Sequence, residues 1–355
     1  MPHKLITLAA QRLRAGGVVA FPTETVYGLG ADARNENAVL RVFEIKGRPA
    51  DHPLIVHLAE AGQASAWAAE ITEPARRLMA RFWPGPLTLV LPARDDVPRV
   101  VTGGQDSVAL RVPNHPLALA LLREFSGANG DAHGGGLAAP SANRFGAVSP
   151  TEARHVRAAF GTQVDQVLDG GPCRFGLEST IVSLLDERPR VLRPGVLPLS
   201  ALREVLGEDG IEHSASSDSA APATLRVPGA LAAHYAPATP LEIHTIDALA
   251  DRATTLLDQG LRIAVLRRNR NLRSQGLPPA LPQFLLPARV EPYARSLYAR
   301  LRELDRFAFD CVLVEAPPVD ETWWAVNDRL ARAAAQWPPR VPLAELTRAS
   351  HWRIP

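Results

Sequence analysis

The chain has 355 residues, of which 46% are hydrophobic and 21% are charged, and its formal net charge is +2. This length predicts two domains, each large enough to bury its own core. No run of eighteen apolar residues occurs and no basic start precedes an apolar signal core, so we expect a cytoplasmic protein rather than a membrane or exported one. The small net charge does not indicate a general nucleic-acid binder. Cys173 and Cys311 lie far apart and outside any C-x-x-C pair, which argues against a disulfide framework and a structural zinc site.

Short apolar runs bounded by glycine, proline and asparagine predict strands in the first 207 residues. Between some of these runs, apolar residues at helical spacing predict helices at 37–45 and 73–82. Strands interspersed with helices predict an α/β domain with a twisted, mixed sheet. The predicted strands are 17–21, 54–58, 87–92, 108–112, 136–139 and 180–185.

The composition changes in residues 208–240, where serine, alanine and proline replace periodic apolar residues. This segment is interpreted as a linker between a first domain, 1–207, and a second domain, 241–350. The second domain has buried-strand patterns that alternate with helical patterns, which predicts a small βα domain. Its predicted strands are 241–246, 262–266 and 311–315, and its predicted helices are 248–259, 292–306 and 324–335.

Two cations stand close together in the segment from Val19 to His57. Lys46 and Arg48 are two residues apart at a predicted helix end, and Pro49 stiffens the loop that follows. They are therefore able to converge on one anion, for which phosphate or carboxylate is the natural candidate. The alternative is a helix whose last turn carries cations that complement its macrodipole.

Other polar residues follow predicted strands. Ser141, Asn143 and Ser149 come after the 136–139 run and are able to donate hydrogen bonds to phosphate oxygens, although a turn with serine and asparagine caps explains them equally well. Arg111 and Arg193 each end a β-like run and are followed closely by proline. Together with the two cations near Pro49, these arginines predict a cleft lined for an anion.

Several enzyme signatures are missing, including G-x-x-x-x-G-K-[ST], H-E-x-x-H, G-x-S-x-G and the kinase motifs. Gly28 and Gly30 lack the third glycine of a dinucleotide fingerprint, so this segment is interpreted as a turn after Tyr27. Glu24 and Glu178 each have a carboxylate that could act as a base. The sequence pairs neither of them with a second titratable group, and a loop carboxylate is more often a cap or an ion-pair partner.

Six motifs occur in a characteristic order: FPTETVYGLG at 21–30, KGRP at 46–49, PSAN at 140–143, GLESTIV at 176–182, LRPG at 192–195 and HYAP at 234–237. With these motifs the chain resembles the threonylcarbamoyl-AMP synthase family, in its longer two-domain form. The resemblance covers nearly the full chain and is strongest in the first 200 residues. It implies a twisted mixed-sheet catalytic domain with a central cationic cleft and a smaller, Rossmann-like C-terminal domain.

The resemblance also implies a reaction. L-threonine, bicarbonate or carbon dioxide, and ATP with Mg²⁺ would give threonylcarbamoyl-adenylate and pyrophosphate. A separate tRNA-modifying transferase complex would then transfer the threonylcarbamoyl group to a tRNA adenosine. A carbamate oxygen would attack the α-phosphate while cations stabilise the leaving group, without a covalent enzyme intermediate.

Site residues are carried over motif by motif. Lys46 and Arg48 would be catalytic and would hold the charge of bicarbonate and phosphate. Ser149 and Arg193 would complete the phosphate and ribose contacts of the nucleotide. The resemblance assigns no metal ligand. The expected ATP-binding residues are Arg48, His52, Ser107, Ser141, Asn143, Ser149, Arg193 and Tyr235. The expected threonine-binding residues are Thr25, His57, Arg111, the backbone of Ala139, and Thr180. His57 alternates with apolar residues on a predicted strand, so a core histidine is the alternative there.

Tyr235 resembles the family tyrosine that folds over the cleft, which would make the linker a lid. Some relatives have arginine immediately before this His-Tyr pair, whereas this chain has Ala233. Two other functions stay open from the sequence: an RNA-binding protein that uses a basic cleft, and a carbamoyltransferase-type domain. The basic segment Arg267–Arg273 offers a weak tRNA contact, although a short basic loop is usually only solvated.

Overall fold

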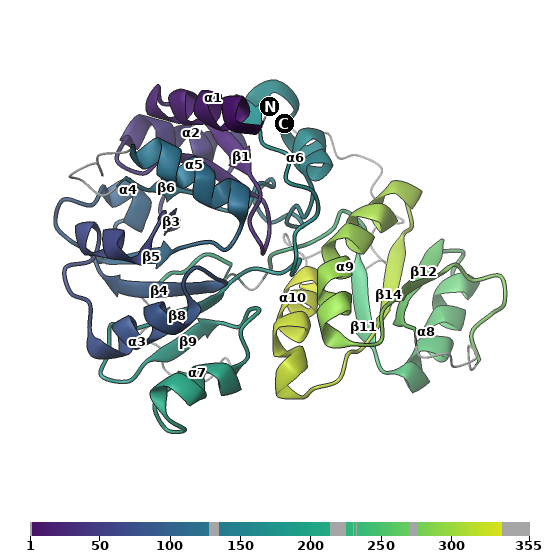
Figure 1. Cartoon of the computed structure of the whole chain (residues 1–355). Coiled ribbons are helices and arrows are strands. Elements are labelled where there is room, and N and C mark those ends of the chain that lie inside the picture. Colours follow the sequence, from purple (N-terminus) through teal and green to yellow (C-terminus); the bar gives the residue numbers. More distant parts are fainter. Residues whose placement is uncertain are drawn as a thin grey trace.

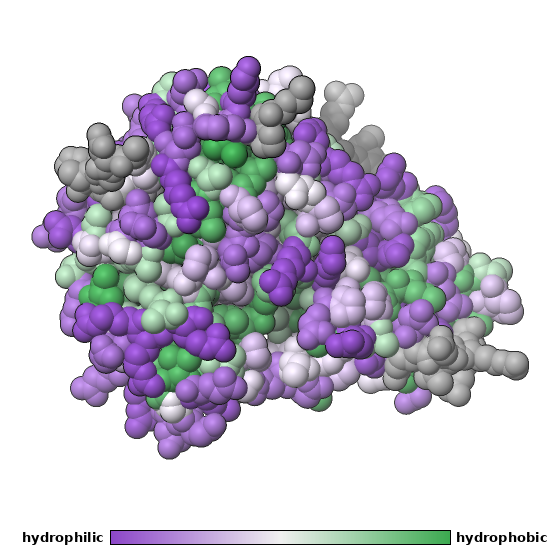
Figure 2. Space-filling model, in the orientation of Figure 1, coloured by the Kyte–Doolittle hydropathy of each residue, from purple (hydrophilic) through white to green (hydrophobic). Residues whose placement is uncertain are grey.

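The computed structural model describes residues 2–127, 135–213, 225–229, 231, 233–269 and 276–335. It has a larger and a smaller domain, seen on the left and right of Figure 1. The predicted α/β class, with a mixed sheet followed by a smaller βα domain, is confirmed. Among the described residues, no helix is long and apolar enough to cross a membrane. The face in Figure 2 is mostly hydrophilic, and its hydrophobic residues form small separate areas.

The larger domain is built on one ten-stranded sheet. In spatial order its strands are β10 (Glu212–His213), β9 (Arg190–Arg193), β8 (Thr180–Ser183), β4 (Leu87–Pro92), β5 (Ser107–Arg111), β3 (Ile55–His57), β6 (Leu137–Ala138), β2 (Gly28–Asp32), β1 (Val19–Phe21) and β7 (Gln166–Val167). The sheet is mixed, because β3 pairs with β5 and β4 with β8 in parallel, whereas β4 and β5 are antiparallel. β10 belongs to the segment predicted to be linker and adds an edge strand to this sheet.

Helices cover both faces of the larger sheet. Val19 and Phe21 pack with α1 and α5, whereas Ala20, between them on β1, packs with α2 and α6 on the other face. This arrangement follows from the alternation of side chains along a strand. The helices of this domain are α1 (Pro2–Arg14), α2 (Glu36–Lys46), α3 (Glu73–Phe82), α4 (Arg99–Thr102), α5 (Pro116–Ser126), α6 (Ala153–Phe160) and α7 (Leu199–Leu206), with 3-10 turns η1 (Ala61–Ala66) and η2 (Gly161–Gln163).

The prediction of a turn at Gly28 and Gly30 is wrong, because these residues begin β2, which is antiparallel to β1. The ring of Phe21 crosses β2 closely. A Cβ atom built on Gly30 would lie 2.6 Å from Cε1 of Phe21. Glycine is therefore required here for a close approach within a sheet and not for a turn.

The smaller domain has a parallel four-stranded sheet with the order β11 (Leu241–His244), β14 (Cys311–Glu315), β12 (Ile263–Arg268) and β13 (Gln283–Leu286). Its helices are α8 (Ile246–Asp258), α9 (Val290–Leu304) and α10 (Trp324–Ala334), with η3 (Asp305–Phe307) and η4 (Glu321–Trp323). On β12, Ile263 and Val265 pack with α8, and Leu266 packs with α9 and α10. Of the predicted basic segment 267–273, Arg267 and Arg268 lie in β12 and 270–273 lie outside the described residues.

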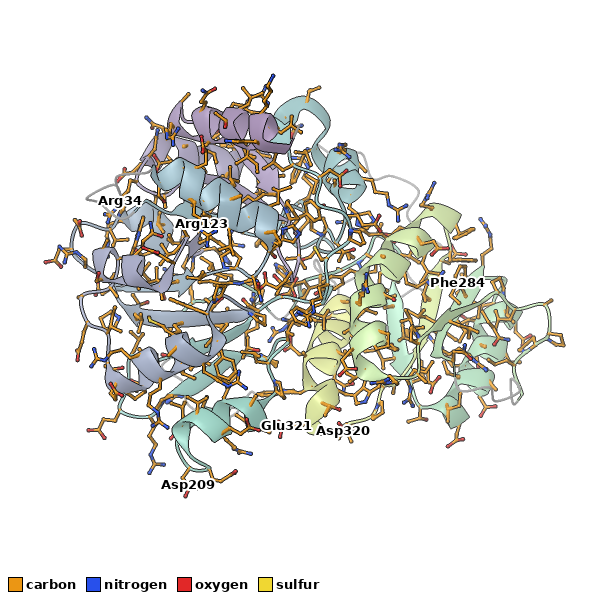
Figure 3. The ribbon with its side chains drawn as sticks, viewed as in Figure 1. Arg34, Arg123, Asp209, Phe284, Asp320 and Glu321 are labelled. Atoms are coloured by element: carbon orange, nitrogen blue, oxygen red, sulfur yellow. The ribbon has the colours of Figure 1, made fainter. Side chains whose placement is uncertain are left out.

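The two domains meet along α9 and α10. The apolar cluster of these helices also contains Val26, Val148 and Leu177 of the larger domain, together with Tyr235. At a second contact, the carboxylate of Glu321 accepts a hydrogen bond of 2.7 Å from the backbone N–H of Ser200 at the start of α7, and Figure 3 shows Glu321 beside that helix. The smaller domain therefore packs directly against the larger one.

Leu301→Ala tests the core of the smaller domain. Leu301 is 1% exposed on α9, so truncation leaves a cavity and is expected to lower the unfolding free energy by about 2–5 kcal/mol. Urea denaturation followed by far-UV circular dichroism measures it. Leu257→Ala on α8, where the side chain is 37% exposed, is the control and should cost less than about 1 kcal/mol. Equal losses in the two variants would contradict the assigned core.

Candidate active site

A cavity of about 50 Å³ lies where the loops after β1 and β6 meet the ends of β3 and β5. Residues Pro228, Gly229, His234 and Tyr235 of the predicted linker also line it. Of the predicted site residues, eight line it: Thr25, Arg48, His57, Arg111, Ala139, Ser141, Arg193 and Tyr235. The other lining residues are Thr23, Val26, Tyr27, Gly28, Ile55, Pro140, Glu178, Ser179, Pro228, Gly229 and His234. The structure thus brings together three arginines from three separate segments, as the predicted anion-lined cleft requires.

His57 and Arg111 reach the cavity from neighbouring strands, because β3 and β5 are parallel and pair His57 with Arg111 in register. Arg111 is buried, and its Nη2 donates to Glu24 Oε1 at 2.7 Å and to Thr25 Oγ1 at 3.0 Å. Its Nη1 has no hydrogen-bond partner among the described residues. Burial, and then the charge of Arg111, lower the pKa of His57 to about 3, so this imidazole is neutral near pH 7.

Lys46 is the last residue of α2. Asn35 caps the start of this helix, and Gly47, with φ of 63°, ends it in the left-handed region that glycine adopts readily. Lys46 does not line the cavity: its Nζ donates to the carbonyls of Ser141 and Asn143, each at 2.6 Å. Burial, and then the charges of Arg48 and Arg144, lower the pKa of Lys46 well below its ordinary value.

Arg48 does line the cavity, and its Nη2 donates to the carbonyl of Pro53 at 3.0 Å. Burial is the main cause that lowers the pKa of Arg48, to about 10, so it keeps its charge near pH 7. The two cations that the sequence predicted to converge on one anion therefore face different partners. Lys46 holds the loop at 141–143, and Arg48 faces the cavity.

Arg193 and Tyr235 lie on the other side of the cavity. Arg193 donates to the carbonyl of Ser179 at 2.8 Å and to that of Pro228 at 2.9 Å, so it ties β9 to the segment that leads to Tyr235. Burial lowers the pKa of Arg193 and raises that of Tyr235. Tyr235 adopts a positive φ of 60°, and its buried hydroxyl has no hydrogen-bond partner among the described residues. Burial also lowers the pKa of His234 to about 3.

Five further predicted residues lie outside the cavity lining. Ser149 donates from Oγ to Glu178 at 2.6 Å, and Thr180 Oγ1 exchanges two 3.0 Å hydrogen bonds with the backbone of Leu197. Asn143 donates from its amide to two carbonyls, whereas its buried Oδ1 has no partner among the described residues. The remaining two are Ser107, buried in β5, and His52, whose ring lies 5.5 Å from that of Phe145 and whose pKa is lowered by burial.

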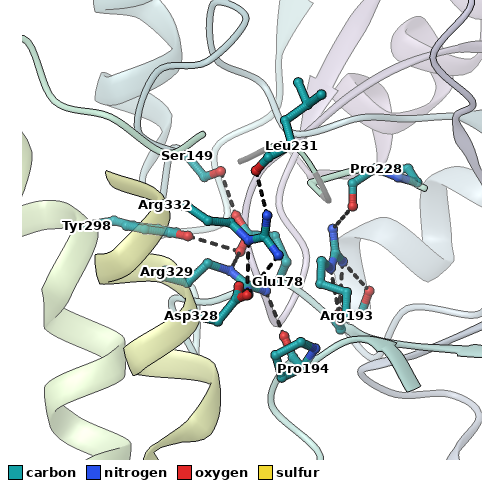
Figure 4. A network of polar contacts seen from close by, with 11 residues as sticks. Ser149, Glu178, Arg193, Pro194, Pro228, Leu231, Tyr298, Asp328, Arg329 and Arg332 are labelled. Atoms are coloured by element: carbon teal, nitrogen blue, oxygen red, sulfur yellow. Dashed lines mark hydrogen bonds and ion pairs between the residues drawn. The ribbon is translucent and has the colours of Figure 1, made fainter. Parts of the chain in front are cut away.

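Sequence reasoning missed the role of Glu178, which lines the cavity. It accepts hydrogen bonds from Ser149, from the Tyr298 hydroxyl at 3.0 Å and from Arg329 Nε at 2.8 Å (Figure 4). Glu24, likewise considered without a partner, forms a buried ion pair with Arg111. Both glutamates stand within recognised motifs, but their arginine partners are too distant in sequence to be inferred.

The residues at hand do not form a protein-only metal site. Among the described residues, no group of three or more histidine, cysteine, aspartate or glutamate side chains could hold a metal ion. The carboxylates of Glu24 and Glu178 are both paired with arginine.

Comparisons with known proteins cover both domains. A family model described as "Telomere recombination" matches residues 11–195, and one described as "Threonylcarbamoyl-AMP synthase, C-terminal domain" matches residues 197–335. Threonylcarbamoyl-AMP synthase of Pyrococcus abyssi is 42% identical over 337 residues, which cover 93% of this chain and 94% of that protein. The Bacillus subtilis protein of the same name is 40% identical and covers 93% and 92%. A crystal structure of P. abyssi Sua5 complexed with L-threonine matches with a TM-score of 0.82 and 40% identity, over 93% of this chain and 94% of that one.

The neutral, buried His57 predicts a pH dependence of stability. The folded-state pKa of about 3 lies below the unfolded value of about 6.5, so the unfolded chain takes up the proton first as pH falls. The stabilisation from His57 is thus complete above about pH 6.5 and is lost toward pH 3. Between about pH 7.5 and 5.5, wild type should lose about 1.4 kcal/mol more than His57→Gln. Urea unfolding at both pH values measures this, and exposed His3→Gln, the control, should match wild type. Equal losses in His57→Gln and wild type would show that this imidazole titrates normally.

Proposed function

The chain belongs to the threonylcarbamoyl-AMP synthase family, and we propose that the cavity lined by Arg48, Arg111 and Arg193 is the place where this enzyme joins its substrates. The chain is a threonylcarbamoyl-AMP synthase, which serves tRNA modification. The single observation that supports the proposed location is that these arginines, from three separate segments, line one cavity. L-threonine and ATP are the substrates, and bicarbonate or carbon dioxide is the proposed third reactant.

The threonine side of the proposed site is centred on Arg111. Its Nη1 is available to a carboxylate while Nη2 remains on Glu24 and Thr25. Neutral His57 can accept a hydrogen bond from the substrate, but its low pKa makes it a poor proton acceptor. The proton that the threonine amine loses as the carbamate forms would therefore leave in the water made from the bicarbonate hydroxyl or, with carbon dioxide as the reactant, would pass to solvent. Ala139 lines the same part of the cavity, whereas the Thr180 hydroxyl is already engaged with Leu197.

The ATP side would be formed by Arg48, Ser141, Arg193 and Tyr235, with His52, Ser107, Asn143 and Ser149 around them. A cavity of about 50 Å³ is far smaller than the roughly 300–1,000 Å³ of ligand pockets. Pro228, Gly229, His234 and Tyr235 would therefore have to move for ATP to enter, which supports the proposal that Tyr235 belongs to a lid. The buried Asn143 Oδ1 and Tyr235 hydroxyl, both without described partners, are groups that a nucleotide would satisfy.

In the proposed reaction, a carbamate oxygen attacks the α-phosphate of ATP and pyrophosphate leaves. Arg48 and Arg193 would stabilise the charge that develops on the phosphates, and Lys46 would keep the 141–143 loop in position. Mg²⁺, when bound to the ATP phosphates, would neutralise the leaving group. Because three reactants must meet, positioning rather than covalent catalysis would supply most of the acceleration.

Outside the site, we propose the cytoplasm as the location, with a tRNA-modifying transferase complex as the downstream partner and at most a weak tRNA contact. No observation favours an RNA-binding protein or a carbamoyltransferase instead. In the basic segment, Arg268 is paired with Glu315 rather than presented to solvent. The deciding property is the dependence of pyrophosphate release on threonine.

The first test measures pyrophosphate release from ATP by the full chain with Mg²⁺ and bicarbonate. Release should require both L-threonine and bicarbonate, and Lys46→Ala should lower kcat/KM about 100-fold or more because the carbonyls of Ser141 and Asn143 lose their shared donor. The control is Lys4→Ala, because Lys4 is the other lysine of the sequence and is exposed on α1. Release that is independent of threonine would overturn the proposed function.

A second test separates the two substrates. Arg111→Lys keeps the charge but has a single terminal nitrogen, so it loses the Nη1 that stays available while Nη2 donates to Glu24 and Thr25. We expect the KM for threonine to rise about 10–100-fold and the KM for ATP to change less than about threefold. Arg99→Lys, at an exposed ion pair with Asp106, is the matched control. A variant with normal threonine KM would place the amino-acid carboxylate elsewhere.

A further inference from the structure

Glu178 is the point at which the smaller domain reaches the wall of the cavity. One of its oxygens, Oε1, accepts from Ser149 of the larger domain at 2.6 Å. The other, Oε2, accepts from two residues of the smaller domain, the Tyr298 hydroxyl of α9 at 3.0 Å and Arg329 Nε of α10 at 2.8 Å. Figure 4 shows the three donors arranged around this carboxylate. A residue of the proposed site is thus held by both domains.

Arg329 contacts the chain on the ATP side of the cavity at several points. It is completely buried, its Nη2 donates to the carbonyl of Pro194 at 2.9 Å, and its Nη1 is paired with Asp328. Pro194 directly follows the cavity residue Arg193. The guanidinium carbon also lies 4.9 Å from the ring centre of Tyr235, within cation–π distance. A single side chain of the smaller domain therefore contacts the catalytic domain and the linker at once.

We propose that Arg329 is a positioning residue of the synthase reaction, which holds Glu178 so that Ser149 faces ATP as a hydrogen-bond acceptor and which fixes Tyr235 and Pro194 on the ATP side. The proposal rests on the proposed function. It gives the smaller domain a defined part in nucleotide binding, although none of the residues described for that domain lines the cavity.

The direction of the Ser149 hydrogen bond has a chemical consequence. An ionised carboxylate only accepts hydrogen bonds, so the Ser149 proton is committed to Glu178. The Ser149 oxygen then has only lone pairs to offer a nucleotide. It suits a ribose hydroxyl or the adenine amino group, and it does not suit the phosphate oxygens that the sequence comparison had allowed. ATP should therefore bind more tightly than a nucleotide that lacks the ribose hydroxyl or the adenine amino group that donates to Ser149.

The charge of Glu178 depends on its neighbours. Burial alone would raise the pKa of Glu178, but the charges of Arg329 and Arg193 and the hydrogen bonds from Ser149 and Arg329 lower it. The other titratable groups around it are Tyr298 from α9 and Tyr235 and His234 from the linker, and burial keeps each of them neutral near pH 7. Without Arg329, the carboxyl group would lose its main cationic partner and would protonate at a higher pH. It would then compete with Ser149 as a donor.

Calorimetric titration with ATP and, separately, with L-threonine tests this on the full chain. Arg329→Gln should weaken ATP binding about tenfold or more at about pH 7.5 and leave threonine binding within about twofold. The ratio of wild-type to variant ATP affinity, measured at the same pH values, should fall as pH rises, because Glu178 of the variant ionises at a higher pH than Glu178 of wild type. Arg329→Lys should restore part of the affinity, because it keeps the charge. A structural role alone would not produce the pH dependence.

Two further variants keep the test decisive if Arg329→Gln folds poorly. Glu178→Gln/Arg329→Gln removes the buried unpaired carboxylate, so it should recover thermal stability but still bind ATP weakly, and the ratio of its ATP affinity to that of wild type should not change with pH. Arg252→Gln is the matched control, because Arg252 makes two 2.7 Å hydrogen bonds to Glu242 within the smaller domain. It should leave ATP affinity within about twofold.

The proposal would be overturned if Arg329→Gln bound ATP with wild-type affinity. It would also be overturned if Arg329→Gln and Arg252→Gln lost the same amount of affinity for both ATP and threonine. Failure of the proposed function is distinguishable, because it would appear as wild-type protein that releases no pyrophosphate in response to threonine. The ATP titrations would still decide the role of Arg329 in that case. A wild-type chain that binds no ATP would overturn both.

Discussion

Several cations have to be buried close together in one domain, and the hydrogen bonds that compensate for their lost hydration determine how the loops around the cavity lie. Lys46 is held by two carbonyls, Arg193 by the carbonyls of Ser179 and Pro228, and Arg111 by Glu24. An unpaired buried charge is too costly to persist, so each loop must present an acceptor at a fixed place. The atoms of the proposed site are ordered by the same hydrogen bonds that compensate for the burial of these charges.

The choice of cation follows from this constraint. Lys46 is one of two lysines in the sequence, whereas the other basic positions are arginine. A compact ammonium with three donors fits between two carbonyls 2.6 Å away, and a planar guanidinium would not. Arg111 needs the two terminal nitrogens of a guanidinium instead, because Nη2 donates to Glu24 and Thr25 and Nη1 is left without a partner among the described residues. Lysine and arginine are therefore not interchangeable at these two positions.

Sequence patterns predicted the elements better than the contacts between them. The strands 87–92 and 311–315 and the helix 73–82 agree residue for residue with β4, β14 and α3, because apolar periodicity and flanking prolines are local signals. β2 was misinterpreted, since glycine in a strand signals a close neighbour only after the ring of Phe21 is placed.

In the same way, most of the residues that line the cavity fall within the six sequence motifs, but the motifs do not show which residues contact one another. The carbonyls that hold Lys46 lie 95 and 97 residues away, and Arg329 is 151 residues from Glu178. Such pairs depend on the packing of sheets and domains, which composition and spacing do not encode locally. Lys46 and Arg48 illustrate the same limit, because these neighbours in sequence have different partners in the structure, the carbonyls of Ser141 and Asn143 for Lys46 and that of Pro53 for Arg48. Lys46 contacts the loop 141–143, whereas Arg48 lines the cavity. The difference arises because the fold brings the carbonyls of Ser141 and Asn143 within reach of Lys46 at the end of α2.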